Sequence, residues 1–139
     1  MLTEVKFTNA RKAFTELFDD VWHRSLPAIV NRRQAEEVVL LRRDLQQYIL
    51  QTYAFRPEVL PEDDGSITIA IDGLDIVVNA PTRSEAIEEL VQELEIYAED
   101  YRDNLNLFLN APNRKAHFPY VLRIWLCEND QEIKSLLEF

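Results

Sequence analysis

Basic and polar side chains near the N-terminus are the residues whose types and spacing suggest chemistry. Some lie around the predicted start of a helix and the others at the end of a predicted strand: Lys6, Thr8, Asn9, Arg11, Lys12, Arg32 and Arg33. We expect Arg11 and Lys12 to lie beside the free backbone amides of a helix N-terminus, a place that favours phosphate oxygens. The neighbouring hydroxyl and amide side chains are suited to hydrogen-bonding phosphate or base edges. Contact with nucleic acid is therefore one of two interpretations of this pattern.

A second interpretation gives the same cations no binding role. Several arginines stand beside carboxylates in the sequence, and paired surface charges usually face water. The residues concerned are Arg32, Arg33, Arg42 and Arg43 beside Glu36, Glu37 and Asp44.

Catalytic and metal chemistry find little support. Five carboxylates stand around one predicted hairpin: Glu62, Asp63, Asp64, Asp72 and Asp75. Hard divalent cations prefer such oxygen ligands, but the spacing of these residues matches no metal-binding motif. His23 and His117 are far apart in sequence, and no nucleophile elbow, phosphate loop or zinc spacing occurs. The single cysteine, Cys127, allows no internal disulfide, and its apolar neighbours predict a buried thiol in a reducing compartment. We expect no enzyme activity, catalytic residue, metal site or cofactor.

The elements that must position the cations follow from hydrophobic spacing. Phe7 to Arg33 predicts a short strand, a helix and a second strand, with Thr8 as the helix N-cap. The helix stripe consists of Ala10, Ala13, Phe14, Leu17, Phe18, Val21 and Trp22. A further strand from Glu37 to Leu41 and a short helix from about Asp44 complete a β-α-β-β-α order.

This first part has more apolar side chains than about 50 residues can cover, which favours a homodimer. The predicted interface consists of Phe14, Leu17, Phe18, Val21, Trp22, Ile29, Val38 and Leu40. The alternative is that these residues pack against the second half of the chain.

Charge divides the chain near the acidic, proline-containing segment Phe55 to Asp64. The net charge is −10, but residues 1–56 hold nine Lys and Arg against seven Asp and Glu, whereas residues 57–139 hold six against 18. We expect a mildly basic domain at 1–56 and an acidic one at 57–139, typical of one part that contacts DNA and another that contacts a basic protein. No signal peptide or apolar membrane span is predicted, so a cytoplasmic location is expected.

The second half predicts an acidic β-β-α-β-α domain, which makes the whole chain α+β. Ile67, Ile69 and Ile71 share one strand face, Asp72-Gly73 predicts a two-residue hairpin turn, and 74–79 alternates again. Thr82 and Glu85 form a capping box ahead of a long helix. Its buried stripe consists of Ala86, Ile87, Leu90, Val91, Leu94, Tyr97, Ala98 and Tyr101. The later segments are predicted as a loop at 110–119, a strand at 120–127 and a helix at 130–139.

Residues 1–53 resemble the prevent-host-death (Phd/YefM) antitoxins. The resemblance rests on Ala10-Arg11, on the strand ending Ile29 to Arg33, and on the strand and short helix that follow, although Gln34-Ala35-Glu36 stands where the family has a glycine-containing turn. Residues 61–103 are loosely similar to HicB-type antitoxin domains, through the acidic lead-in 62–66 and the Thr82 to Ala86 helix start.

The Phd/YefM resemblance implies a dimeric DNA-binding N-terminal domain in which the positions of Arg32 and Arg33 contact DNA. The expected function is therefore an antitoxin that represses its own operon and neutralises a cognate toxin, plausibly a basic ribonuclease that cleaves mRNA. A stand-alone transcriptional regulator whose acidic domain senses a partner or ligand is the alternative. A structural adaptor without DNA contact is a third interpretation.

Overall fold

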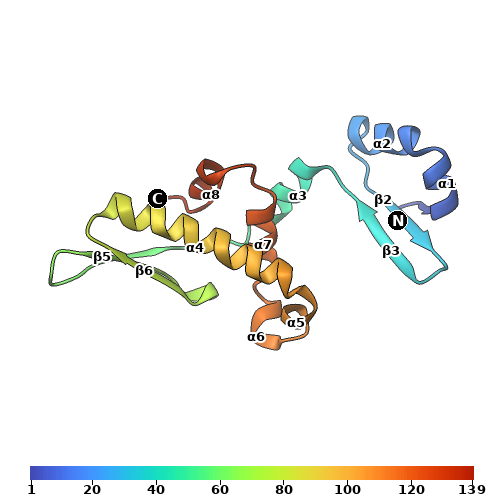
Figure 1. The fold of residues 1–139 in the computed structure, drawn as a ribbon. Coiled ribbons are helices and arrows are strands. Elements are labelled where there is room, and N and C mark those ends of the chain that lie inside the picture. The colour runs from blue at the N-terminus through green and yellow to red at the C-terminus, as the bar shows by residue number, and fades with distance from the viewer. The chain divides into compact units, whose positions relative to one another are not determined.

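The structure is a computed structural model that describes residues 1–139 and contains helices and two separate three-stranded sheets (Figure 1). The chain divides into two compact units, Met1–Ile49 and Leu50–Phe139. This division places 50–56 with the second unit, where Phe55 is part of the hydrophobic core. The assignment of two independent domains, 1–56 and 57–139, stays a prediction.

The first unit has the element order that the hydrophobic spacing predicts, except that the helix is split in two. Its elements are β1 (Glu4–Lys6), α1 (Phe7–Lys12), α2 (Phe14–His23), β2 (Ala28–Arg32), β3 (Glu36–Leu40) and α3 (Arg43–Leu50). Strand β2 is central, parallel to β1 and antiparallel to β3. Few side chains are buried here, namely Ala10, Val21, Ala28 and Val30.

The predicted N-cap at Thr8 is wrong. Helix α1 begins at Phe7, directly after β1, and the residue with the extended backbone of an N-cap is Lys6, which makes no side-chain cap. Thr8 therefore lies in the first helical turn. The split between α1 and α2 falls at Ala13, whose φ of −120° and ψ of 38° are not helical.

The β2–β3 hairpin turns without glycine. Arg33 and Gln34 both have left-handed backbones, with φ of 55° and 60°. The Ala35 amide donates to the Arg32 carbonyl at 3.3 Å, which closes the turn. Although 34–36 lacks the glycine of the resembled family, the turn is still tight. Two residues other than glycine adopt the left-handed conformation, which usually favours glycine.

The second unit is a strand meander followed by helices. Its elements are β4 (Glu58–Pro61), β5 (Ile67–Ile71), the 3-10 turn η1 (Asp72–Leu74), β6 (Ile76–Ala80), α4 (Arg83–Asp103), α5 (Leu105–Leu109), α6 (Pro112–Lys115), α7 (Phe118–Trp125) and α8 (Asp130–Leu136). The sheet is antiparallel with the order β4-β5-β6. Strand β4 lies within the segment Phe55 to Asp64, where the sequence predicts the division between the two parts of the chain.

Helix α4 packs on β5 and β6 and also contacts α7 and α8 (Figure 1). The predicted stripe of α4 is confirmed, because Leu90, Leu94 and Tyr101 are fully buried and only Tyr97 is half-buried. The predicted strand face is confirmed as well, since Ile69 and Ile71 are buried against this helix.

The β5–β6 hairpin is confirmed, but its predicted turn is wrong. Register pairs Ile71 with Ile76, so four residues rather than two form the connection. The left-handed residue is Asp75, with φ of 55°, and not Gly73. Aspartate tolerates this conformation better than most residues, which explains why no glycine is needed there.

The predicted strand at 120–127 and loop at 110–119 are also wrong. The first lies mostly in α7, and the second contains α6 and the start of α7. Short apolar runs fit a strand or a buried helix equally well by periodicity. Val121 and Ile124, three residues apart, are both buried, and a proline stands in the first turn of α7, where helices accept it. The predicted last helix is confirmed as α8.

The α4 N-cap generates a stability prediction. Thr82 Oγ1 accepts a hydrogen bond from the Glu85 amide at 3.2 Å, which satisfies one of the free donors of the first turn. We expect Thr82→Ala to lower the free energy of unfolding of the second unit by about 1 kcal/mol. Ser84→Ala, in the same helical turn and without a side-chain cap, is the control. Chemical denaturation followed by circular dichroism measures both, and equal stability of Thr82→Ala and wild type would contradict the assignment.

Candidate nucleic-acid interface

The predicted DNA-binding residues all lie on the first unit, around β1, α1 and the end of β2, and their side chains are exposed. Parallel pairing sets Lys6 beside Asn31, so the C-terminal ends of β1 and β2 lie at the same end of the sheet. The Arg32 guanidinium stacks on the Phe7 ring at 5.2 Å from its centroid. The structure therefore brings Lys6 and Arg32 together at the start of α1.

The predicted position of Arg11 and Lys12 at a helix N-terminus is wrong for α1. Both lie in its last turn, immediately before α2, because the helix begins earlier than the sequence suggests. The cations near the start of α1 are instead Lys6, which precedes the helix, and Arg32, whose guanidinium stacks on the Phe7 ring. Arg11 and Lys12 remain exposed and form no ion pair. Thr8 and Asn9 lie between the two pairs of cations, on the same short helix.

Arg32 and Arg33 have carboxylate partners, as the second interpretation of the charges expects. Arg32 forms an ion pair with Glu36, its Nε lying 2.9 Å from Oε2, and Arg33 Nη1 lies 3.9 Å from Glu36 Oε1. Exposed ion pairs contribute at most about 1 kcal/mol, so phosphate is able to compete for both arginines. Among the predicted DNA-binding cations, Lys6, Arg11 and Lys12 have no such competitor.

An apolar groove of about 330 Å³ lies elsewhere on the first unit. Its lining consists of Phe14, Phe18, Val21, Trp22, Leu40, Leu41, Arg42 and Arg43. Phe14, Phe18 and Trp22 are 52%, 57% and 49% exposed, although an aromatic ring is costly to leave in water.

The other predicted interface residues differ in burial. Val38 is exposed on β3, whereas Leu17, Ile29 and Leu40 are half-buried. Val21 is buried within the unit and forms the floor of the groove.

Arg42 shapes one wall of the groove. Its guanidinium stacks on the Trp22 ring at 4.4 Å and donates to the Trp22 carbonyl at 3.2 Å and to Ser25 Oγ at 2.7 Å. It also pairs with Asp44 at 2.8 Å, and this hydrogen bond lowers the pKa of the Asp44 carboxyl. The sequence reveals the Asp44 pairing but not the Trp22 contact, because 20 residues separate the two side chains.

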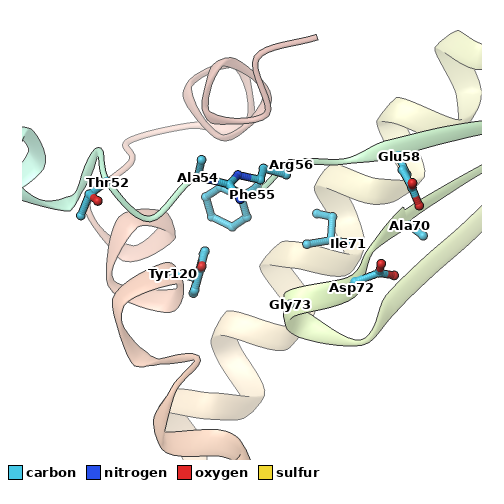
Figure 2. A pocket seen from close by; sticks show the side chains of 10 residues that line it. All are labelled: Thr52, Ala54, Phe55, Arg56, Glu58, Ala70, Ile71, Asp72, Gly73 and Tyr120. Atoms are coloured by element: carbon cyan, nitrogen blue, oxygen red, sulfur yellow. The ribbon is translucent and has the colours of Figure 1, made fainter.

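A pocket of about 460 Å³ lies in the second unit, between the N-terminal segment of that unit, the β5–β6 turn and α7 (Figure 2). Phe55 packs edge-on against Tyr120 at 5.5 Å at one end. Glu58 and Asp72 lie at the other end, and Arg56 has a left-handed backbone with φ of 52°. Sequence reasoning missed this pocket, because its residues come from three distant segments.

The carboxylates considered as a metal set do not converge. No group of three or more His, Cys, Asp or Glu side chains is arranged to hold a metal ion. Asp64 Oδ1 instead accepts from the Ser66 amide at 2.9 Å and from its hydroxyl, which lowers the pKa of Asp64. This aspartate therefore shapes the turn ahead of β5.

His117 belongs to a buried polar cluster that its sequence neighbours do not reveal. Arg114 Nη1 donates to Tyr97 Oη at 3.0 Å, and Tyr97 Oη lies 2.6 Å from His117 Nδ1. Arginine only donates, so the tyrosine hydroxyl is free to donate to the imidazole, which suits a neutral ring. Tyr101 Oη donates to the Arg114 carbonyl at 2.9 Å. The cluster joins α4 to α6 and to the start of α7.

Comparisons with known proteins agree on one family. The family model PHD_like, described as antitoxin of toxin-antitoxin, RelE / RelB, TA system, matches residues 1–139. A crystal structure from Syntrophomonas wolfei subsp. wolfei, described as the antitoxin part of a proposed toxin/antitoxin system, is 34% identical. The alignment covers 97% of this chain and 96% of that chain, with a TM-score of 0.85. A comparison with curated proteins finds no match.

None of the helices combines the length and apolar character needed to cross a membrane.

The buried histidine predicts pH-dependent stability. Burial, followed by the nearby Arg114 charge, lowers the pKa of His117 below its usual 6.5. The unfolded chain therefore takes up a proton before the folded chain does, and the free energy of unfolding falls as the pH drops below about 6.5, by at most about 1.4 kcal/mol per pH unit.

We expect His117→Gln to remove this slope between pH 7.5 and 5.5, and His23→Gln, at an exposed position, to retain it. Urea denaturation across this pH range measures both variants. The same slope in wild type and His117→Gln would show that another group is responsible.

Proposed function

Because the chain belongs to the PHD-like family of antitoxins from RelE/RelB toxin–antitoxin systems, we propose that it is a DNA-binding antitoxin. In this proposal the first unit has a Phd/YefM-like role: it dimerises, binds operator DNA and represses its own operon. The second unit binds and neutralises the cognate toxin.

The observation that carries the DNA-binding proposal is the group of exposed cations along β1 and α1. Lys6, Arg11 and Lys12 have no ion-pair partner, in a chain whose net charge is −10. Phosphate contacts need only a local group of cations, and such contacts supply most of the non-specific affinity for DNA. Thr8 and Asn9 on the same helix are the candidates for contacts with base edges or phosphates.

A second copy of this chain is the proposed occupant of the apolar groove. The groove and the exposed valines of β3 leave the first unit with apolar surface in contact with water. Exposed apolar patches of this kind often mark protein–protein interfaces. A symmetric dimer would cover the same patch on both copies. It would also pair two sets of cations about one two-fold axis, as a palindromic operator requires.

The acidic second unit supports binding to a basic toxin. Residues 57–139 hold 18 Asp and Glu against six Lys and Arg. A ribonuclease that cleaves mRNA would have the complementary positive surface, because its substrate is a polyanion. The unit is folded rather than an extended tail, so docking of a preformed surface is the proposed mode of neutralisation.

One observation favours the alternative of a stand-alone regulator with a sensing domain. The pocket beside Phe55 and Tyr120 combines aromatic walls with carboxylates, as small-molecule sites do. Gene order discriminates between the two functions. A short adjoining frame that encodes a basic protein supports the antitoxin, and an isolated gene supports the regulator.

The unpaired cations generate a DNA-binding prediction. We expect the protein to prefer its own promoter over a scrambled duplex by about 10³-fold or more, and Arg11→Ala/Lys12→Ala to weaken binding to both duplexes. The slope of log affinity against log salt should fall by about 1 for each phosphate-binding cation that is removed. Fluorescence anisotropy at several salt concentrations measures these values. Arg24→Ala, which removes one exposed cation outside β1 and α1, is the control. Equal, weak binding of wild type to both duplexes would exclude operator recognition.

The groove generates a prediction of oligomeric state. A buried aspartate without a partner is strongly unfavourable, so Phe18→Asp should convert the dimer to a monomer. Size-exclusion chromatography with light scattering gives the mass. Leu107→Asp, at a comparably exposed site of the second unit, should leave the dimer intact. A wild-type monomer at micromolar concentration, or a Phe18→Asp dimer, would contradict the proposed interface.

A further inference from the structure

We infer that the solvent face of α4, centred on Ile96, is the surface that binds the basic toxin. This inference rests on the proposed antitoxin function and assigns it to one surface of the second unit. The partner chemistry is a protein surface with an apolar contact at its centre and Lys or Arg side chains around it.

The geometry of α4 places Ile96 at the middle of its exposed face. At 100° per residue, Ile96 points away from the core stripe of Ile87, Leu94 and Ala98. Ile96 is 57% exposed, although the other apolar side chains of α4 are buried or half-buried. The residues within about 60° of Ile96 on this helix are all exposed and nearly all acidic: Glu85, Glu89, Gln92, Glu93, Glu99, Asp100 and Asp103.

This acidic face gains little from interactions inside the protein. Among the carboxylates around Ile96, only Asp103 forms an ion pair, with Arg102 at 3.8 Å. Several carboxylates instead repeat at the i, i+4 spacing, as in Glu85, Glu89 and Glu93. Like charges at this spacing destabilise a helix by about 0.2–0.5 kcal/mol a pair.

Carboxylate crowding continues beside this face. The pKa of Glu95 is raised, first by burial and then by the negative charges of Asp130 and Glu99. A basic partner would relieve the repulsion along α4, because each of its cations would lie among several carboxylates.

An apolar centre within a charged rim is the usual anatomy of an energetic hot spot at a protein interface. The other acidic segment of this unit offers less. Asp64 is used by the turn before β5, and no exposed large apolar side chain stands at 62–66. Charge complementarity therefore favours the α4 face as the docking surface for a basic protein.

The test measures the affinity of full-length protein for the protein encoded by the adjoining gene. Glu93→Lys/Glu99→Lys reverses two charges on the face. Each new ammonium would stand four residues after a carboxylate, that of Glu89 or Glu95, so attractive pairs replace repulsive ones and the variant should melt at or above the wild-type temperature. We expect affinity to fall by about 100-fold or more in this variant, and by about 10-fold in Ile96→Ala.

The controls match each change elsewhere on the same unit. Glu62→Lys/Asp63→Lys alters the net charge equally, and Val77→Ala truncates another exposed apolar side chain. Both should change the affinity by less than about 3-fold. Wild-type binding that all four variants retain equally would overturn the α4 assignment while leaving the antitoxin function intact. Failure of wild type to bind would instead contradict the proposed toxin neutralisation itself.

Discussion

The packing of α4 against β5 and β6 is the contact on which the second unit depends. Leu90 and Leu94 are fully sealed from solvent, as are Ile69 and Ile71 in the facing strand, so one apolar stripe holds the sheet to the helix. The same packing fixes the opposite side of the helix in solvent. A 21-residue helix that is tightly packed along one side presents a rigid face of carboxylates on the other. Rigidity matters for the proposed docking, because a preformed surface has little conformational entropy to lose on binding.

The first unit has the contrasting constraint of a small core. Its sheet is stabilised by side chains such as Val30 and Ala28, while three aromatic rings of α2 remain about half exposed. Arg42 holds the end of α2 to the start of α3 through Trp22, which keeps these rings on one surface. A second copy supplies the missing cover in the proposed dimer. Dimerisation and DNA binding would then be linked, since two half-sites are needed for the full electrostatic gain.

Sequence pattern predicted the elements whose periodicity is local. The α4 stripe, the Thr82 cap, the β5–β6 hairpin and the strand–helix order of the first unit followed from spacing alone. It failed where tertiary context decides, as at 120–127, where an apolar run is a helix because Val121 and Ile124 pack together against α4. The residues chosen for DNA contact lie in one unit. The Arg32–Glu36 pairing and the start of α1 at Phe7 depend on how the hairpin turns and where β1 ends, which periodicity does not predict. The His117 cluster and the Phe55–Tyr120 pocket join distant segments, for which the sequence holds no periodic signal.

In the proposed antitoxin, DNA binding and toxin binding belong to different units of one chain. Native mass spectrometry of the full-length protein, mixed with its promoter duplex and the protein encoded by the adjoining gene, shows whether both partners bind at once. We expect a single assembly that contains two copies of this chain, one duplex and the adjoining gene product. Two mutually exclusive complexes, in which the adjoining gene product and the duplex displace one another, would contradict it.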